Sequence, residues 1–391
     1  MAVAGPQEPT SSLADDLKAL QGLLSNLHSQ RLELRKQIKD LIDQLAPAPA
    51  PTSSSKSRLN VMTLNLQYFS SYPSDEAKAA KKLREATGVD EPSSAADVIA
   101  IQEGLASKDV LGQVGYDKVI CSGAEGKAQS VREMVYGDAA TLKICPPEYH
   151  DELLCNQIYI RRGSDWEVVD QGVEQISSKL RLKGGGNRVE GPLAIRSMVW
   201  AKFRKRGCEG FVYVMCAHIT GGRFEDQYYI QQLSHERHEQ PSRCVEFFQQ
   251  RPDPKPQDVG ILVGDFNALS EYDEGGPMSG YYKFGIATSE GVKSDAEAAG
   301  LEPEKIEEVF KDYMVSPFKA LKRKGWRFAY GKEIGITSSF GHLIDHMAMS
   351  RPLEVAGVEI KYLTNQKMGD KEPDTDIVIT DHNSVVVSFL V

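Results

Sequence analysis

Apolar residues recur along the chain at two different spacings, and the change of spacing divides it into parts. Residues 12–46 carry leucine or isoleucine at alternating four- and three-residue steps, broken only at Arg31. This heptad pattern predicts a coiled-coil helix that pairs with another copy or a partner helix, or docks on the protein's own surface. Residues 1–11 carry no such pattern and are predicted to be disordered, and the Ala-, Pro- and Ser-rich residues 47–57 predict a linker.

From residue 58 to residue 391, short apolar runs alternate with helical patterns, which predicts one α/β domain. The run 211–216 is apolar throughout and predicts a strand in the middle of a sheet covered on both faces. Helices are predicted at 75–87 and 225–239, and Pro241 predicts the start of a second short helix. Two sheets that share a core, with helices outside, satisfy this pattern. The predicted strands are 59–65, 98–102, 118–121, 157–161, 194–203, 211–218, 260–265, 346–350, 358–362 and 384–390.

Composition narrows the class of protein. A hydrophobic content of 41% and an aromatic content of 8% are typical of a globular protein. The net charge of −9 argues against global electrostatic binding of long duplex DNA, so any contact with a polyanion is local. The six cysteines show no CxxC spacing, which indicates neither a zinc site nor a disulfide framework. No signal peptide and no run of about 18 apolar residues is present. The expected location is therefore intracellular, in the cytoplasm or the nucleus.

Polar residues stand at the ends of the predicted strands, where catalytic groups tend to converge. Any one of them has a structural explanation as a turn former or a hydrogen-bonded core residue. Together they supply hard oxygen ligands for Mg²⁺ and histidines that move protons near pH 7. The ordered set predicts metal-assisted hydrolysis of phosphoesters. Its members are Asn65, Glu103, His218, Asp265, Asn267, Asp345, Asp381 and His382.

Six short motifs, in this order, resemble those of the endonuclease/exonuclease/phosphatase superfamily of metal-dependent phosphoesterases. They are Met62-Thr63-Leu64-Asn65, Ile101-Gln102-Glu103, Ala217-His218, Gly264-Asp265-Phe266-Asn267, Leu343-Ile344-Asp345-His346 and Thr380-Asp381-His382-Asn383. The resemblance covers residues 58–391. It implies a four-layer αββα sandwich of two mixed β-sheets flanked by helices, preceded here by the coiled-coil helix. It also implies an enzyme that uses Mg²⁺, with Mn²⁺ as the alternative.

The resemblance implies a role for each site residue. Glu103 becomes the direct metal ligand, with Asn65 and Asp381 beside the ion. Asp265 and Asn267 hold the attacking water and a phosphate oxygen, Asp345 orients His382, and His218 is the second histidine. The base is either His382 or Asp265, and His218 protonates or hydrogen-bonds the leaving group. Three residues are predicted to assist: Asn156 by orienting His218, and Arg196 and Arg223 by binding phosphate.

The substrate is less sharply indicated. The motif around Asp345 lacks the Trp-Cys-Asp-Arg signature of inositol 5-phosphatases, and Gln67 stands where AP endonucleases carry an acidic residue. A nuclease-like phosphodiesterase that takes a nucleic acid is the leading prediction. The alternatives are a phosphatase or a lipid phosphodiesterase of the inositol phosphate or sphingomyelin type, and a catalytically inactive scaffold tethered by the coiled coil. The intact set of acidic and histidine residues speaks against the scaffold.

Overall fold

The computed structural model describes most of the predicted domain and little of what precedes it. The predictions for residues 1–11, for the coiled coil (except Gln30) and for linker residues 47–55 lie outside the described residues. The predicted strands that form the site all fall, at least in part, within them. The described residues are 30, 56–66, 76–91, 93–134, 147–178, 181–182, 191–192, 195–221, 230–251, 257–272, 302–338, 342–363 and 380–391.

Two mixed β-sheets form the centre of the described residues. The seven-stranded sheet has the order β14 (Glu354–Lys361), β15 (Ser384–Leu390), β1 (Arg58–Asn65), β2 (Val98–Leu105), β5 (Leu153–Arg161) and β3 (Tyr116–Cys121), with β4 (Gln129–Ser130) paired to β5. The six-stranded sheet has the order β12 (Arg327–Phe328), β13 (Asp345–Met349), β11 (Val259–Asp265), β10 (Val212–Ala217), β9 (Ser197–Lys205) and β6 (Trp166–Gln175). A separate pair joins β7 (Arg181–Leu182) and β8 (Gly191–Pro192).

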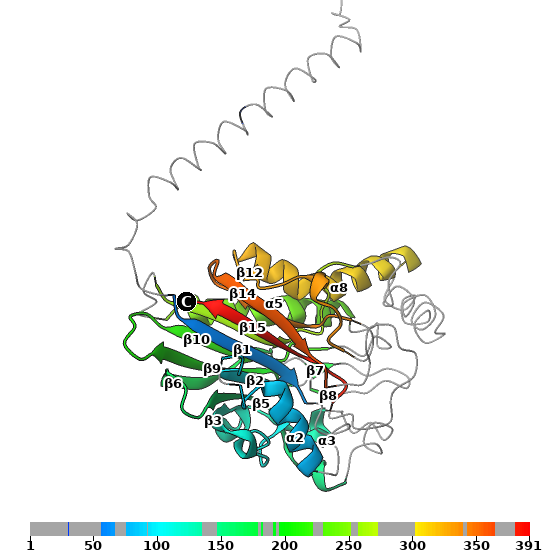
Figure 1. Ribbon diagram of the computed structural model, residues 1–391. Coiled ribbons are helices and arrows are strands. Elements are labelled where there is room, and N and C mark those ends of the chain that lie inside the picture. The colour runs from blue at the N-terminus through cyan, green and yellow to red at the C-terminus, as the bar shows by residue number, and fades with distance from the viewer. Residues whose placement is uncertain are drawn as a thin grey trace, which may run out of the picture. The chain divides into compact units, whose positions relative to one another are not determined.

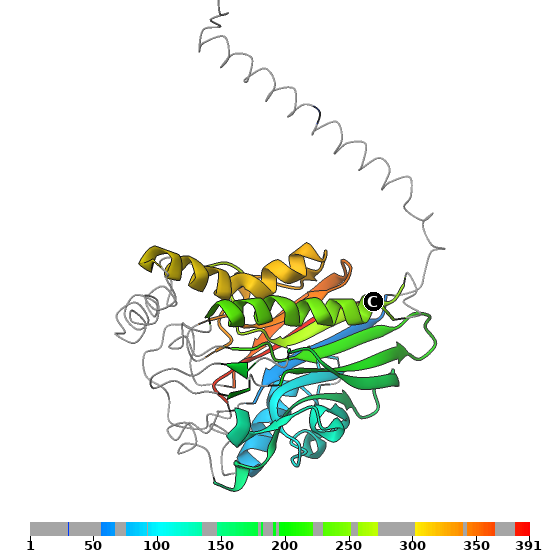
Figure 2. The same ribbon diagram turned by 180° about the vertical axis from the view of Figure 1, so that it is seen from behind.

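Alternating side chains on each strand build three layers of core. On β1, Leu59 and Val61 face the second sheet, while Met62 and Leu64 pack on the opposite side with Leu83 of helix α2 (Glu76–Thr87). The outer side of the six-stranded sheet packs against α5 (Ile230–Gln249) and α8 (Pro303–Arg323). Figures 1 and 2 show α5 and α8 side by side over that sheet, with α2 on the other side of the sandwich. The described chain is thus an α/β sandwich of two mixed sheets with flanking helices.

The smaller elements lie in the connections. They are helix α3 (Val131–Met134) and the 3₁₀ turns Gly112–Val114, Ser122–Glu125, Pro147–Tyr149 and Lys332–Ile334. None of the described helices is long and apolar enough to cross a membrane.

The structure corrects the prediction around Pro241. No second helix begins there, because Pro241 lies inside the continuous helix α5. Proline removes one helical hydrogen bond. The buried side chains Leu233, Cys244 and Val245 on both sides of it hold the helix on the sheet. Strand β6 and helix α8 were not predicted from the sequence. The middle of β6 is exposed, and α8 is interrupted in sequence by Pro317.

Candidate active site

Strand direction brings the predicted residues to one edge of the two facing sheets. Strands β1 and β2 run parallel, so Asn65 and Glu103 lie at the same edge. Strand β15 is antiparallel to β1, so its start, just after His382, lies there too. In the other sheet, β10 and β11 run parallel and place His218 and Asp265 at their carboxyl ends, where the antiparallel β13 begins. Residues far apart in sequence therefore form one site.

A buried histidine and aspartate form the first part of this site. Nδ1 of His382 lies 2.9 Å from Oδ2 of Asp345, and both side chains are almost fully buried. A carboxylate only accepts hydrogen bonds, so Nδ1 carries the proton and Nε2 faces the site. Nε2 lies 3.8 Å from Oδ2 of Asp265 and 3.7 Å from Oδ1 of Asp381. Burial alone would lower the pKa of His382, but Asp345 and then the other two carboxylates raise it to about 10.

Asn65 joins a partly buried carboxylate, Glu103, to a buried one, Asp265. Its Nδ2 group donates to Oε1 of Glu103 at 3.1 Å and to Oδ2 of Asp265 at 3.0 Å. Burial raises the pKa of Glu103, the Asn65 hydrogen bond opposes this effect, and the nearby Asp381 charge adds to it. Burial also raises the pKa of Asp265, and although the charge of His382 opposes it, the value reaches about 7. The site thus holds a carboxyl group that can gain or lose a proton near neutral pH.

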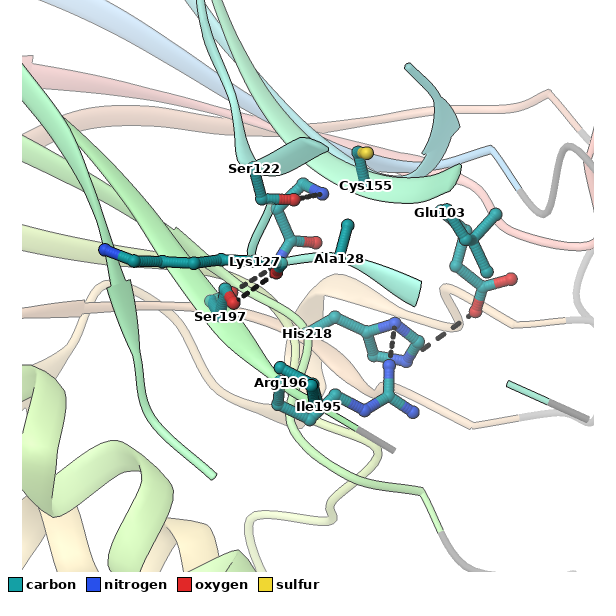
Figure 3. A pocket seen from close by; sticks show the side chains of 11 residues that line it. Glu103, Ser122, Lys127, Ala128, Cys155, Ile195, Arg196, Ser197 and His218 are labelled. Atoms are coloured by element: carbon teal, nitrogen blue, oxygen red, sulfur yellow. Dashed lines mark hydrogen bonds and ion pairs between the residues drawn. The ribbon is translucent and has the colours of Figure 1, made fainter. Parts of the chain in front are cut away.

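His218 lies between a cation and the carboxylates. Nη1 of Arg196 is 2.8 Å from its Nδ1, and its Nε2 is 3.6 Å from Oε1 of Glu103 and 3.6 Å from Oδ2 of Asp265. Nδ2 of Asn267 lies 3.0 Å from the same Nε2. Figure 3 shows Arg196 and Glu103 on different sides of the ring. Burial and then the charge of Arg196 hold the pKa of His218 well below its usual value, so the ring is neutral at pH 7.

The backbone is unusual at two of these residues. Glu103 has a φ of 54° and Asn267 a φ of 49°, and they are the only non-glycine residues with positive φ in the described ranges. Left-handed backbone is unfavourable for L-residues and clusters at functional sites. Gly264, with a φ of 144°, precedes Asp265, and a Cβ there would lie 1.9 Å from the Ala217 carbonyl oxygen. The two site-bearing strands therefore approach each other closely at this edge.

The three assisting residues have different outcomes. Nδ2 of Asn156 donates to the Ser197 carbonyl of β9 at 2.6 Å, and its role in orienting His218 stays a prediction. Asn156 lines a small pocket of about 20 Å³ together with Arg196 and His218 (Figure 3). That space is enough for about one water molecule. Arg223 lies outside the described residues.

The side chains fit a divalent cation. Oε2 of Glu103 is buried and has no hydrogen-bond partner among the described residues, which is costly unless a cation takes that place. Ligand atoms of Glu103, His218 and Asp265 all lie within 4.8 Å of one another. Asn65 donates a hydrogen bond to Glu103, and the charge of Asp381 raises the pKa of Glu103. The three predicted metal residues therefore lie near one another.

Two threonines in the site were not recognised from the sequence. Oγ1 of Thr337 accepts hydrogen bonds from the backbone amides of Ile344 at 3.0 Å and Asp345 at 3.1 Å, which fixes the start of β13. Oγ1 of Thr380 donates to the Asn65 carbonyl at 2.7 Å. Thr380 opens the motif Thr380-Asp381-His382-Asn383, but no role was predicted for it. Thr337 offers no signal in the sequence, because its partners come from a tertiary contact.

No protein-family model and no curated protein matches the sequence. Solved structures with a similar fold include an endonuclease/exonuclease/phosphatase from Beutenbergia cavernae, with 13% identity, a TM-score of 0.48, and coverage of 85% of this chain and 72% of the other. The human Nocturnin catalytic domain has 14% identity, a TM-score of 0.48, and coverage of 85% and 94%. D. rerio TDP2 in complex with a single-strand DNA product has 13% identity, a TM-score of 0.46, and coverage of 85% and 99%.

Several of the similar structures are endonuclease/exonuclease/phosphatase proteins, and the superfamily resemblance stated from the motifs stays a prediction. At these identities and scores no substrate can be transferred to this chain. The chemistry has to be inferred from its own side chains.

Proposed function

We propose that this protein hydrolyses phosphoester bonds with the help of a divalent metal ion. One observation carries the proposal: a set of carboxylates, two histidines and one asparagine meets at a single edge, and one carboxylate oxygen each of Glu103 and Asp345 has no hydrogen-bond partner among the described residues. A cluster of buried acids that serves structure alone would be expected to satisfy its oxygens with protein donors. Charge and ligand type therefore favour a cation and an anionic substrate.

In this proposal Glu103 holds Mg²⁺ or Mn²⁺, and Asn65 and Asp381 lie beside the ion. When bound, the ion neutralises charge on the phosphate and stabilises the departing oxygen. Asn65 keeps the carboxylates of Glu103 and Asp265 in place through its two hydrogen bonds of 3.1 and 3.0 Å. This fixed arrangement avoids reorganisation when charge develops.

The proton-transfer roles follow from the pKa values. With a pKa of about 10, His382 is a cation at neutral pH and is suited to stabilising negative charge on phosphate. With a pKa of about 7, Asp265 is the group of this pair that can accept a proton from water near neutrality. Asp345 orients His382 and stabilises its charge through the 2.9 Å contact. Of the two candidate bases, these values favour Asp265.

His218 and Arg196 serve the other side of the substrate in this proposal. Arg196 can only donate, so Nδ1 of His218 accepts from it, while Nε2 faces the Asn267 amide and the carboxylates of Glu103 and Asp265. A neutral His218 can donate a hydrogen bond from Nε2 to the leaving oxygen. The guanidinium of Arg196 adds a positive charge for a phosphate oxygen.

The balance of charge favours a phosphodiester as substrate. The described site contains the carboxylates of Glu103, Asp265, Asp345 and Asp381, against the cations Arg196 and His382. With a divalent ion bound these charges sum to about zero, so the site neutralises the single charge of a phosphodiester more fully than the two charges that a phosphomonoester can carry near neutral pH. A nuclease-like phosphodiesterase is therefore the preferred function.

The test is a panel of phosphoesters incubated with the full chain in Mg²⁺, in Mn²⁺ and in EDTA. The panel contains bis-p-nitrophenyl phosphate, p-nitrophenyl phosphate, single-stranded DNA, RNA, sphingomyelin and inositol phosphates. We expect diesters to be hydrolysed faster than the matched monoester, and EDTA to abolish turnover. Faster turnover of the monoester would indicate a phosphatase. The absence of turnover on every substrate would favour the inactive scaffold.

A further inference from the structure

Arg237 is a buried cation whose place the active-site chemistry does not explain. It lies on helix α5 and is 0% exposed. By volume it is the largest fully buried side chain among the described residues. Arginine is almost never fully buried unless its charge and donors are matched. Among the described residues, its hydrogen bonds go to backbone carbonyls from three different parts of the chain.

Two of those carbonyls belong to the loops that carry active-site residues. Nη1 of Arg237 donates to the carbonyl of Thr220 at 2.6 Å, and Nη2 donates to the carbonyl of Asn267 at 2.6 Å. Thr220 follows β10 and lies two residues after His218, while Asn267 lies two residues after the end of β11. One planar guanidinium therefore ties together the loops at the ends of two parallel strands.

The third carbonyl anchors the guanidinium to helix α8. Nε of Arg237 donates to the carbonyl of Tyr313 at 3.0 Å, and the guanidinium lies 4.1 Å from the centre of the Tyr313 ring. In an uninterrupted helix this carbonyl would accept from the amide four residues later, but that residue is Pro317, which has no N–H. Pro317 thus leaves an acceptor that Arg237 uses.

The side chains held by these loops touch each other. Nδ2 of Asn267 lies 3.0 Å from Nε2 of His218 and donates to the Ile219 carbonyl at 3.0 Å. One turn along α5 from Arg237, Gln240 accepts from the amide of Thr220 at 2.9 Å and donates to its hydroxyl at 2.8 Å. The loop after β10 is thus fixed from α5 at three of its polar atoms, just beyond His218.

We propose that Arg237 is a positioning residue for the phosphoester site, which sets the distance between Asn267 and His218 by holding the Thr220 and Asn267 carbonyls against helix α8. This role rests on the proposed function. A purely structural role would predict lost stability without a specific loss of turnover. A positioning role predicts that turnover falls even in a variant that remains folded, because small displacements of catalytic groups lower rates steeply.

The test compares Arg237→Lys with Arg161→Lys. Lysine keeps the buried charge but presents a single nitrogen, so it cannot reproduce a planar fork with three separated donors. Arg161 is the control, because its partly buried guanidinium lies 2.8 Å from Asp97 at the start of β2, at the opposite end of that strand from Glu103. Both variants are measured for kcat and KM on bis-p-nitrophenyl phosphate with Mg²⁺ and for thermal unfolding.

We expect Arg237→Lys to lower kcat by about 10- to 100-fold with KM changed only a few-fold, and Arg161→Lys to keep kcat near the wild-type value. In an Asn267→Ala background, Arg237→Lys should lose little more, since both changes act on the same group. If kcat of Arg237→Lys stays within two-fold of that of Arg161→Lys, or if its loss persists in full in the Asn267→Ala background, the positioning role is wrong.

The outcomes separate this role from the proposed function. A wild-type enzyme that turns over the diester while Arg237→Lys keeps its rate overturns the positioning role alone. A wild-type enzyme that turns over none of the phosphoesters overturns both. If Arg237→Lys does not fold, Pro317→Ala provides the second variant, because it restores an amide that competes for the Tyr313 carbonyl. A positioning role then predicts a lower kcat without loss of helix, and an unchanged kcat contradicts it.

Discussion

Replacing Asp345 by asparagine tests whether His382 and Asp345 act as a pair. The contact between Nδ1 of His382 and Oδ2 of Asp345 is 2.9 Å long, and Asp345 is 0% exposed. Asparagine has nearly the same shape, so the change removes the charge while the packing around it is retained. Its amide oxygen can still accept from Nδ1, which isolates the effect of charge from that of hydrogen bonding.

The magnitude follows from the pKa of His382. Burial alone would lower this pKa, but Asp345 leads the carboxylates that raise it from 6.5 to about 10. At about 1.4 kcal/mol for each pH unit, the protonated ring is favoured by a net free energy on the order of 5 kcal/mol. Without Asp345, only the smaller effects of Asp265 and Asp381 oppose burial, so the pKa of His382 falls and its charge at neutral pH is reduced. We expect kcat to fall by about 10²- to 10³-fold, the range typical of losing one group that stabilises charge developing in the transition state.

The assay measures kcat on bis-p-nitrophenyl phosphate with Mg²⁺ for wild type, Asp345→Asn, His382→Ala and the double variant. The double variant should lose little beyond the worse single one, since the two residues act as a unit. Asp97→Asn is the control, because Asp97 is also buried and paired, with Arg161 at 2.8 Å, but lies at the start of β2. Fully additive losses, or an equal loss in Asp97→Asn, would refute the pairing.

Three further predictions concern the other histidine, pH and the N-terminal segment. His218→Gln should slow substrates with a poor leaving group more than those that release p-nitrophenolate, and equal slowing of both would exclude its role at the leaving oxygen. In EDTA, protonation of His382 stabilises the fold because its pKa is raised to about 10. This contribution is complete below pH 6.5 and is lost as pH rises through about 10. The difference in free energy of unfolding between wild type and Asp345→Asn, measured in urea, should therefore decline across that window. Deleting residues 1–57 should leave an active monomer, while the full chain self-associates or binds a partner helix. Sedimentation of both chains tests this prediction. A full chain that is monomeric at micromolar concentration would exclude strong self-association.

The sequence could predict the site because each of its main residues adjoins an apolar strand. The predicted strand 384–390 matches β15, and the start of β1 differs by one residue. Strand order and direction were not predicted from the sequence; the structure supplies them, and its parallel pairs β1–β2 and β10–β11 place their ends together. Strand β6 was not predicted because its hydrophobic pattern is weaker: Val168 and Val169 in it are 37% and 44% exposed.

What the sequence could not predict depends on contacts between distant segments. The prediction of a helix start at Pro241 followed local propensity, yet burial of the helix against the sheet outweighs one lost hydrogen bond. Thr337 and Arg237 look like ordinary polar residues in sequence. Their functions arise from backbone amides and carbonyls that only the folded chain places within reach. The amide nitrogen of Asn156 donates to the carbonyl of Ser197, a contact that the sequence did not predict.

The central claim is that a divalent ion held by Glu103 drives phosphodiester hydrolysis. The most direct test is an Mg²⁺ titration of bis-p-nitrophenyl phosphate turnover by EDTA-treated wild type and Glu103→Gln. We expect wild-type turnover to rise from zero and saturate, and Glu103→Gln to need far more Mg²⁺ and reach a rate lower by orders of magnitude, because one ligand charge is lost. Turnover that is independent of Mg²⁺, or a Glu103→Gln titration curve identical to that of wild type, would contradict the account.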